Sequence, residues 1–126
     1  MGYEFNYNIP IYIQIVDIIK LDIISGKLKP GDKLPSVRVY ANNLKVNPNT
    51  MQKAMNELED LKLIFTERTN GKFVTDDINL IKEFKNNHIN NIVNNYFKDM
   101  ELINVGKREA IKYILEKSDK NEFSRI

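Results

Sequence analysis

The sequence predicts a mainly helical α+β fold in two parts, with a single small β-hairpin. Three observations support this prediction. Two short helical patterns are separated by three residues, two β-type runs around a turn signal follow directly, and a long helical segment extends from residue 77 onward. We therefore expect a winged helix-turn-helix over residues 1–76 and a C-terminal α-helical appendage over residues 77–126.

The helix pair lies between Lys33 and Lys62. Its first helix is predicted by apolar residues at i, i+3, i+4 and i+7, which are Val37, Tyr40, Ala41 and Leu44, and Ser36 can cap it. After a three-residue turn, Asn47 is a natural N-cap, and Pro48 suits the first helical position because it has no N–H to leave unpaired. The expected buried stripe of the second helix is Met51, Ala54, Met55, Leu58 and Leu61. In a helix-turn-helix the second helix enters the DNA major groove.

The opposite face of this second helix is polar. It holds amide, hydroxyl and basic side chains, from Asn49, Thr50, Gln52, Lys53 and Asn56. Asn and Gln can bond adenine through two hydrogen bonds, so the N-terminal half of the helix is suited to contact base edges. The other half carries Glu57, Glu59 and Asp60, which phosphates would repel. A merely solvated helix face is the alternative interpretation.

An N-terminal helix is predicted from Pro10 to about Ser25, with Gly26 placed to end it. One apolar side is formed by Ile11, Ile15, Ile18, Ile19 and Leu21, and further apolar residues widen it almost all round. Such a helix should be buried on more than one side, beneath the helix pair. The turn Pro30-Gly31 follows, and then a very short strand at Leu34.

Residues 64–75 predict a β-hairpin with a two-residue type I′ turn at Asn70-Gly71. The side chains expected to anchor it on the core are Phe65, Phe73 and Val74. Arg68, Gly71 and Lys72 lie around its tip, where a wing contacts phosphates or enters the minor groove. The alternative is a plain surface hairpin.

Positive charge is concentrated on the predicted helix pair and hairpin. The 126 residues carry a net charge of +2, yet residues 20–75 hold ten basic and six acidic side chains, whereas residues 1–19 hold two acids and no base. This distribution favours a nucleic-acid partner. The sequence has no cysteine, no apolar run of about 18 residues and no signal-peptide pattern, so we expect a cytoplasmic protein without a membrane span.

No motif of catalysis or cofactor binding stands out. The sequence lacks a Gly-rich phosphate loop, a nucleophile elbow and a zinc pattern, and its only histidine, His88, has no set of neighbouring metal ligands. We expect no enzyme activity, metal or cofactor. The rival to a DNA-binding protein is a protein-interaction adaptor, which would need an apolar outer face on the helix pair.

The appendage has an apolar stripe that recurs mostly in steps of four. Each step drifts by about 40°, so the stripe spirals around the helix. A break at Val105-Gly106 precedes a second helix over residues 107–117 and a polar tail over 118–126. We expect a twofold homodimer, since two helices cannot bury these faces alone; the alternative is a helical pair packed on its own domain. The expected dimerisation residues are Phe84, Ile89, Ile92, Val93, Tyr96, Phe97, Met100, Ile111, Ile114 and Leu115.

Residues 9–76 closely resemble the winged helix-turn-helix of the GntR family of bacterial transcription regulators. The resemblance is carried by G-x-L-x-P-G-D-x-L-P-S-x-R from Gly26 to Arg38, by V-N-P-N-T from Val46 to Thr50, and by a hairpin ending in Phe-Val. The short two-helix tail resembles the YtrA subfamily, in which it serves for dimerisation. The resemblance implies a transcription regulator, expected to be a repressor, of a kind whose members often repress operons encoding ABC transporters. The expected twofold homodimer would supply two recognition helices for a palindromic double-stranded DNA operator.

Carried over by position, Ser36 and Arg38 match the family's S-x-R, whose arginine commonly contacts DNA. Asn49 and Thr50 match the start of the recognition helix, and Gly71 matches the second wing glycine. Lys53 departs from a frequent arginine, and Thr69 departs from the usual first wing glycine. With Lys33 as a phosphate contact, the expected DNA-binding residues are Lys33, Ser36, Arg38, Asn49, Thr50, Gln52, Lys53, Asn56, Arg68, Gly71 and Lys72. The sequence indicates no particular small-molecule effector.

Overall fold

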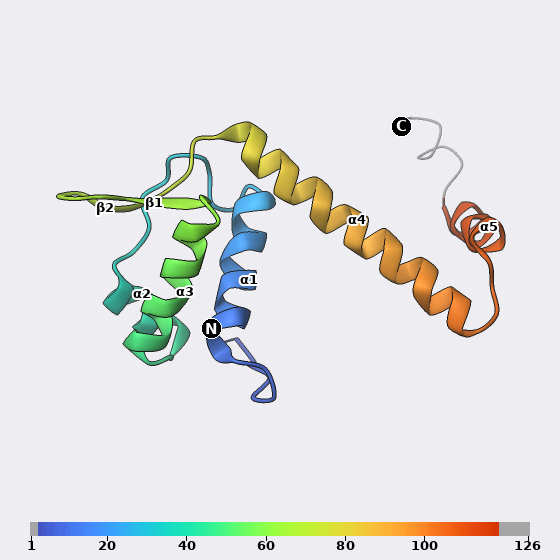
Figure 1. Cartoon of the computed structure of the whole chain (residues 1–126), viewed down its shortest axis with the longest axis horizontal. Helices are drawn as coiled ribbons and strands as arrows, with labels where there is room; N and C mark the ends of the chain where they lie inside the picture. Colours follow the sequence, from blue (N-terminus) through green and yellow to red (C-terminus); the bar gives the residue numbers. More distant parts are fainter. Residues whose placement is uncertain (1–2, 119–126) are drawn as a thin grey trace. The chain divides into compact units, whose positions relative to one another are not determined.

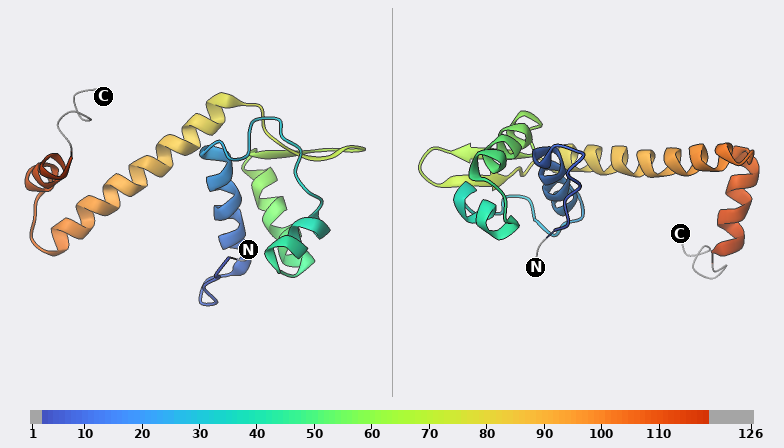
Figure 2. Two further views of the ribbon diagram at one scale, coloured as in Figure 1. Left: turned by 180° about the vertical axis from the view of Figure 1, so that it is seen from behind. Right: turned by 90° about the horizontal axis from the view of Figure 1, so that it is seen from below.

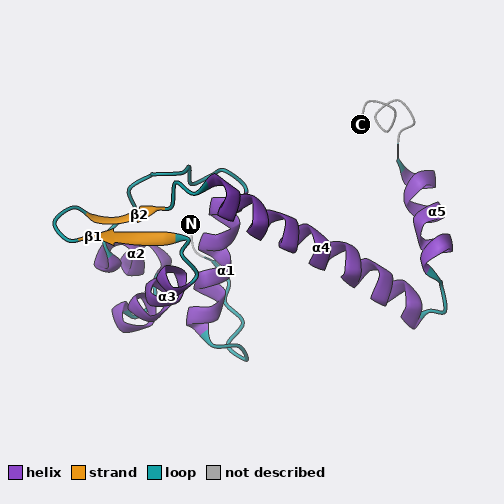
Figure 3. Ribbon diagram, turned by 45° about the horizontal axis from the view of Figure 1, so that its top comes forward, coloured by secondary structure: helices purple, strands orange, loops and turns teal. Residues whose placement is uncertain are grey.

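A computed structural model describes residues 3–118 of the chain. Within this range the elements are α1 (Ile11–Ile24), α2 (Val37–Leu44), α3 (Pro48–Asp60), β1 (Ile64–Glu67), β2 (Gly71–Val74), α4 (Ile78–Leu102) and α5 (Lys107–Lys117) (Figures 1 and 3). The chain divides into two compact units, Met1–Lys85 and Asn86–Ile126. The first unit contains the expected winged helix-turn-helix together with the first turns of α4.

The core of the first unit lies between α1, α3 and the base of the hairpin (Figure 1). Its fully buried side chains include Ile15, Ile19, Ile23, Met51, Met55, Leu58, Leu63 and Val74. The predicted burial of α1 on more than one side is confirmed, because α1 packs on α3 and its Lys20 ammonium lies 5.6 Å from the Phe84 ring centroid at the start of α4. Leu21 was expected on the buried side, which is wrong: it is 44% exposed. At about 100° per residue it lies only about 40° from Asp17, on the solvent side.

The stripe of α2 is confirmed as well. Ala41 and Leu44 are buried, and Val37 and Tyr40 pack partly against the core. Burial, together with the nearby Asp22 and Tyr3, raises the pKa of the Tyr40 hydroxyl to about 12.

The hairpin is extended by a third stretch of backbone. Strand β2 pairs with β1 on one side, and on its other side the segment before α2 supplies an isolated bridge between Lys33 and Phe73. The Leu34 N–H donates to the Lys72 carbonyl at 2.8 Å, and the Val74 N–H donates to the Asp32 carbonyl at 2.8 Å. The short strand expected near Leu34 is therefore this bridge, which ties the wing to the entrance of α2.

The predicted two-residue turn at Asn70-Gly71 is wrong. Glu67 pairs with Gly71, so three residues form the tip, and of Asn70 and Gly71 only the glycine has a positive φ, +102°. A type I′ turn needs positive φ at both positions. It would also pair Val74 with Glu67, whereas the buried Val74 pairs with the buried Ile64. Burial of this apolar pair at the base of the hairpin sets the register.

Of the expected anchors, only Val74 is buried. The Phe65 ring is 37% exposed and stacks on the half-buried Phe73, with 5.7 Å between the ring centroids. Ile64 takes the anchoring role instead, since it is 2% exposed and alternates with Phe65 across the pleat.

The second unit consists of the remainder of α4 and of α5, which turns steeply away from the axis of α4 (Figure 2). The Tyr96 hydroxyl donates to the Ala110 carbonyl at 2.6 Å, and Ala110 is fully buried. The predicted interruption between the two helices is confirmed: α4 ends at Leu102 and α5 begins at Lys107. Asn104, in the connection, has a φ of +63°. Of the polar tail expected over residues 118–126, all but the first residue lie outside the described range.

Candidate nucleic-acid interface

The turn between α2 and α3 is built by local hydrogen bonds. The Ser36 hydroxyl accepts from the Val39 N–H at 3.2 Å and caps α2. Lys45 ends α2 in the left-handed conformation, and the Asn47 side chain accepts from the Asn49 N–H at 2.7 Å. Both predicted caps and the three-residue turn are confirmed. They fix the start of α3, where Pro48 and Asn49 are exposed.

The outer face of α3 carries the predicted polar residues. Asn49, Gln52, Lys53 and Asn56 are exposed, and Thr50 is half-buried. The Gln52 side-chain amide donates to the Asn56 carbonyl oxygen at 2.8 Å, which aligns two amides one helical turn apart. The pair leaves the Gln52 oxygen as an acceptor and the Asn56 amino group as a donor. These are the complementary groups that base edges present in the major groove.

Lys53 leans away from the middle of this face. Its ammonium lies 4.2 Å from the centroid of the Tyr12 ring on α1, within cation–π range. The positive charge is thus held at the α1 edge of the recognition helix. A charge in that position is suited to a backbone phosphate more than to a base edge.

Lys72, predicted as a wing contact, is turned toward α3. Its ammonium lies 2.6 Å from a Glu59 carboxylate oxygen and 2.9 Å from the Thr66 hydroxyl, and its side chain is only 17% exposed. The Thr66 hydroxyl also donates to Glu59. We call Glu59, Thr66 and Lys72 the wing clamp. It joins the C-terminal part of α3 to both strands of the wing.

The wing clamp perturbs the Glu59 carboxyl. Partial burial raises its pKa, but hydrogen bonds from Lys72 and Thr66 and the positive charge of Lys72 outweigh burial, so the pKa lies below the usual value. Sequence reasoning treated Glu59 only as an acid that DNA repels. Its partner is thirteen residues away across a hairpin, so no local pattern could have revealed it.

Replacing Glu59 with glutamine should lower the free energy of unfolding by roughly 0.5–1 kcal/mol near pH 7, because the ion pair is lost. A carboxyl with a depressed folded-state pKa stabilises the fold above its unfolded pKa, and this contribution is lost as the pH falls through the folded pKa. Wild type and Glu59→Gln should therefore converge as the pH falls below the unfolded-state pKa, about 4.3, and through the lower folded-state pKa. Urea unfolding at pH 7 and pH 3 measures both differences, with Glu57→Gln as the control on the same helix. An equal gap at both pH values would contradict the assignment.

The wing and the segment before α2 enclose a shallow hollow. Its lining includes five of the residues predicted to bind DNA, namely Lys33, Ser36, Arg68, Gly71 and Lys72. A Cβ built on Gly71 would lie 3.5 Å from the Lys33 Cε, so the Lys33 side chain runs along the glycine backbone. Arg68 is exposed at the hairpin tip. Arg38 is exposed on the first turn of α2 and lines a separate hollow with Asn42 and Pro48, next to the start of α3.

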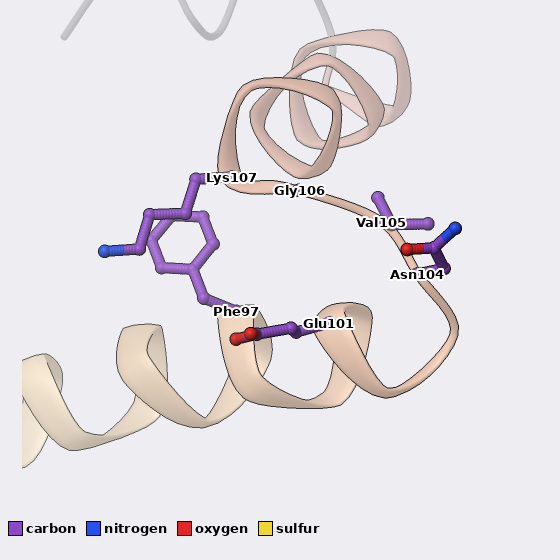
Figure 4. Close-up of a pocket in the computed structure, with 6 residues that line it drawn as sticks. All are labelled: Phe97, Glu101, Asn104, Val105, Gly106 and Lys107. Carbon is purple, nitrogen blue, oxygen red and sulfur yellow. The ribbon is translucent and has the colours of Figure 1, made fainter.

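The second unit has its own hollow at the turn between α4 and α5 (Figure 4). Phe97 and Glu101 come from α4, Asn104 to Gly106 form the connection, and the Lys107 ammonium lies 5.6 Å from the Phe97 ring centroid. Within residues 3–118, no three His, Cys, Asp or Glu side chains gather as metal ligands would, and no helix is long and apolar enough to cross a membrane.

The family model for bacterial regulatory proteins of the gntR family matches residues 11–74. The chain is 36% identical to the HTH-type transcriptional regulator YhcF of Bacillus subtilis over 90% of this chain and 94% of that protein. It is 46% identical to the HTH-type transcriptional repressor YtrA of the same organism, over 54% of this chain and 52% of that protein. Similarity to YhcF thus includes the helical tail, and similarity to YtrA is confined to about half of each chain.

Solved structures give the same result. A GntR family transcriptional regulator from Listeria monocytogenes superposes with a TM-score of 0.83 at 36% identity, covering 90% of this chain and all of that one. The AraR DNA-binding domain, crystallised with operator ORR3, matches with a TM-score of 0.51 at 29% identity, over 60% of this chain and 88% of that one. The expected winged helix-turn-helix with C-terminal helices is confirmed. The chain belongs to the GntR family of bacterial transcriptional regulators.

Proposed function

We propose that this regulator represses transcription by binding a palindromic DNA operator as a homodimer in the cytoplasm. The observation that carries the proposal is the capped start of α3, which exposes Asn49 and the aligned amides of Gln52 and Asn56. In this arrangement α3 lies in the major groove and its amides contact base edges. The AraR DNA-binding domain, which is 29% identical to this chain, was crystallised in complex with an operator, and this supports operator binding.

Backbone contacts would flank the bases. Lys33 and Arg68 line the hollow beside the wing, and Arg38 lies next to the start of α3. Lys53 lies at the opposite, α1 edge of the recognition helix. Cationic groups on both sides of α3 suit a duplex whose phosphates border the groove on both sides, and such contacts fix the register without reading sequence. Because the wing clamp neutralises Lys72, Arg68 and Lys33 carry the free charge of the wing in this proposal.

We propose that the homodimer forms through exposed apolar side chains of the second unit. Ile89, Ile92 and Val93 of α4 and Ile111, Ile114 and Leu115 of α5 are all more than 40% exposed. Soluble monomers rarely leave a large contiguous apolar surface in water, and a second copy would cover it. Phe84, also expected in the interface, packs partly on the core of its own first unit. By analogy with YtrA-type regulators, we further propose control of an operon encoding an ABC transporter, which expression analysis of a deletion strain would test.

A salt titration tests the proposed DNA binding. Duplex DNA of random sequence should bind at low salt, and a protein making about six to ten phosphate contacts loses roughly 10³- to 10⁵-fold in affinity between 50 and 200 mM salt. Selection from a random library should then give a palindrome whose half-site centres lie about 10 base pairs, or a multiple, apart. Absent or salt-independent binding to DNA would contradict the proposal and favour the adaptor.

A further inference from the structure

The N-terminal arm, residues 3–9, folds back on the first turns of α1. Gln14 holds it with three hydrogen bonds. Its side-chain oxygen accepts from the Asn6 N–H at 2.8 Å, and its amino group donates to the Asn6 carbonyl at 2.6 Å and to the Ile9 carbonyl at 3.0 Å. The Ile9 N–H donates to the Asn6 carbonyl at 3.1 Å, which closes a tight loop. One side-chain amide thus fixes the arm to a rigid helix.

The arm is also packed on one side and open on the other. Phe5 is half-buried and packs against the core, whereas Tyr7, two residues further along, is 86% exposed. The hydrogen bonds of the loop and the packed Phe5 fix the backbone on both sides of Tyr7, so a contact through Tyr7 needs the ordering of one side chain and not of the arm. The backbone that carries Tyr7 is therefore preorganised.

The position of the arm relates Tyr7 to the proposed DNA interface. Phe5 and Tyr7 share a hollow with Lys45, Asn47 and Thr50, the residues of the turn and of the first turn of α3. The ribbon shows the arm at the same end of the first unit as this turn (Figures 1 and 2). The arm thus continues the surface on which α3 exposes Asn49.

The chemistry of the arm selects the kind of contact. Residues 1–19 carry no Lys or Arg, and the only charge on the arm is Glu4. The arm cannot attract DNA by charge, but a tyrosine hydroxyl can donate to a phosphate oxygen, and its ring can lie against a sugar. A neutral contact of this kind adds affinity without releasing counterions, so it leaves the salt dependence of binding unchanged.

We propose that residues 3–9 form a second DNA-contacting element, in which Gln14 positions the arm and the Tyr7 hydroxyl bonds the sugar–phosphate backbone beside the start of α3. This inference rests on the proposed operator binding and extends its footprint to an element outside the helix-turn-helix and the wing. Tyr7 is the contact residue, and Gln14 is a positioning residue that acts through the arm backbone.

The test uses the full chain and an operator obtained by selection. Tyr7→Phe removes only the hydroxyl and should weaken operator binding by the dimer about tenfold. Each of the two subunits would contribute about a threefold loss, because their free energies add. The slope of log affinity against log salt should stay as in the wild type, and ethylation of one backbone phosphate per half-site should cease to interfere with binding. Gln14→Ala should reproduce both effects through release of the arm. Tyr113→Phe, in the second unit, is the matched control and should bind as the wild type does.

Wild-type affinity and an unaltered interference pattern for Tyr7→Phe, with normal operator binding by the unsubstituted protein, would overturn the arm contact and leave the proposed function intact. A protein that binds no duplex at any salt concentration would overturn both. Circular dichroism and thermal unfolding of Tyr7→Phe and Gln14→Ala keep the result interpretable. Loss of binding by Gln14→Ala with an unchanged melting temperature supports the positioning role, and loss that occurs only together with unfolding contradicts it.

Discussion

Replacing Arg38 with alanine is expected to weaken operator binding by about 10²- to 10⁴-fold and to leave the dimer intact. Arg38 is exposed on the first turn of α2 and lines the hollow next to Pro48, where the recognition helix begins. A hydrogen bond to a charged group contributes about 1.5–3 kcal/mol, and a twofold dimer makes the contact twice. Fluorescence anisotropy on a labelled operator measures the affinity, and sedimentation velocity measures the oligomeric state.

Two further substitutions separate the role of Arg38 from a general loss of charge. Arg108→Ala removes the same charge from α5 in the second unit and should change affinity by only a few-fold. Arg38→Lys keeps the charge without the planar fork of donors, so it should recover part of the affinity and restore the salt slope. Equal affinity of Arg38→Ala and the wild type would contradict the assignment, and so would an equal loss for Arg108→Ala.

The helix-turn-helix was predictable because the residues that determine it are close together in the sequence. Ser36 and Asn47 cap helices that begin one residue later, and Pro48 fixes the first helical position. The apolar residues of α3 recur every three or four positions, so they lie on one face of the helix. This spacing identifies the buried face even when the elements that pack on it are unknown. The same short range explains why the outward face of α3 was predicted residue by residue.

Non-local contacts were the features that sequence patterns could not supply. The dipeptide Asn70-Gly71 favours a two-residue turn, but pairing of the buried Ile64 and Val74 sets another register. The sequence predicts Lys72 as a free wing cation, but in the fold it pairs with Glu59 on α3. The N-terminal arm has no clear helical or strand-like spacing of apolar residues. Its conformation depends on the Gln14 side-chain amide, which forms hydrogen bonds with the backbone of Asn6, eight residues away. In each case a contact between residues distant in the sequence decides the structure, and no local pattern reports it.

The double substitution Ile92→Lys and Ile114→Lys is expected to convert the dimer to a monomer. The two side chains are 56% and 48% exposed on α4 and α5, and both belong to the expected interface. Placing four lysines in one twofold contact would leave charges buried without partners, which costs several kcal/mol for each buried charge. Size-exclusion chromatography with light scattering measures the mass. Leu102→Lys, at an 85% exposed apolar site outside the expected interface, is the matched control and should remain dimeric.

The monomeric variant should also lose operator affinity, by about 10²- to 10⁴-fold, although its DNA-binding surface is unaltered. In a dimer, binding of one half-site holds the second recognition helix at a high effective concentration beside the other half-site. A monomer must bind each half-site separately, so the variant should bind a single half-site as well as the wild-type subunit does. Retention of dimer mass by the double variant would show that the exposed residues of α4 and α5 serve another contact. Monomer mass with full palindrome affinity would show that the recognition helices act independently.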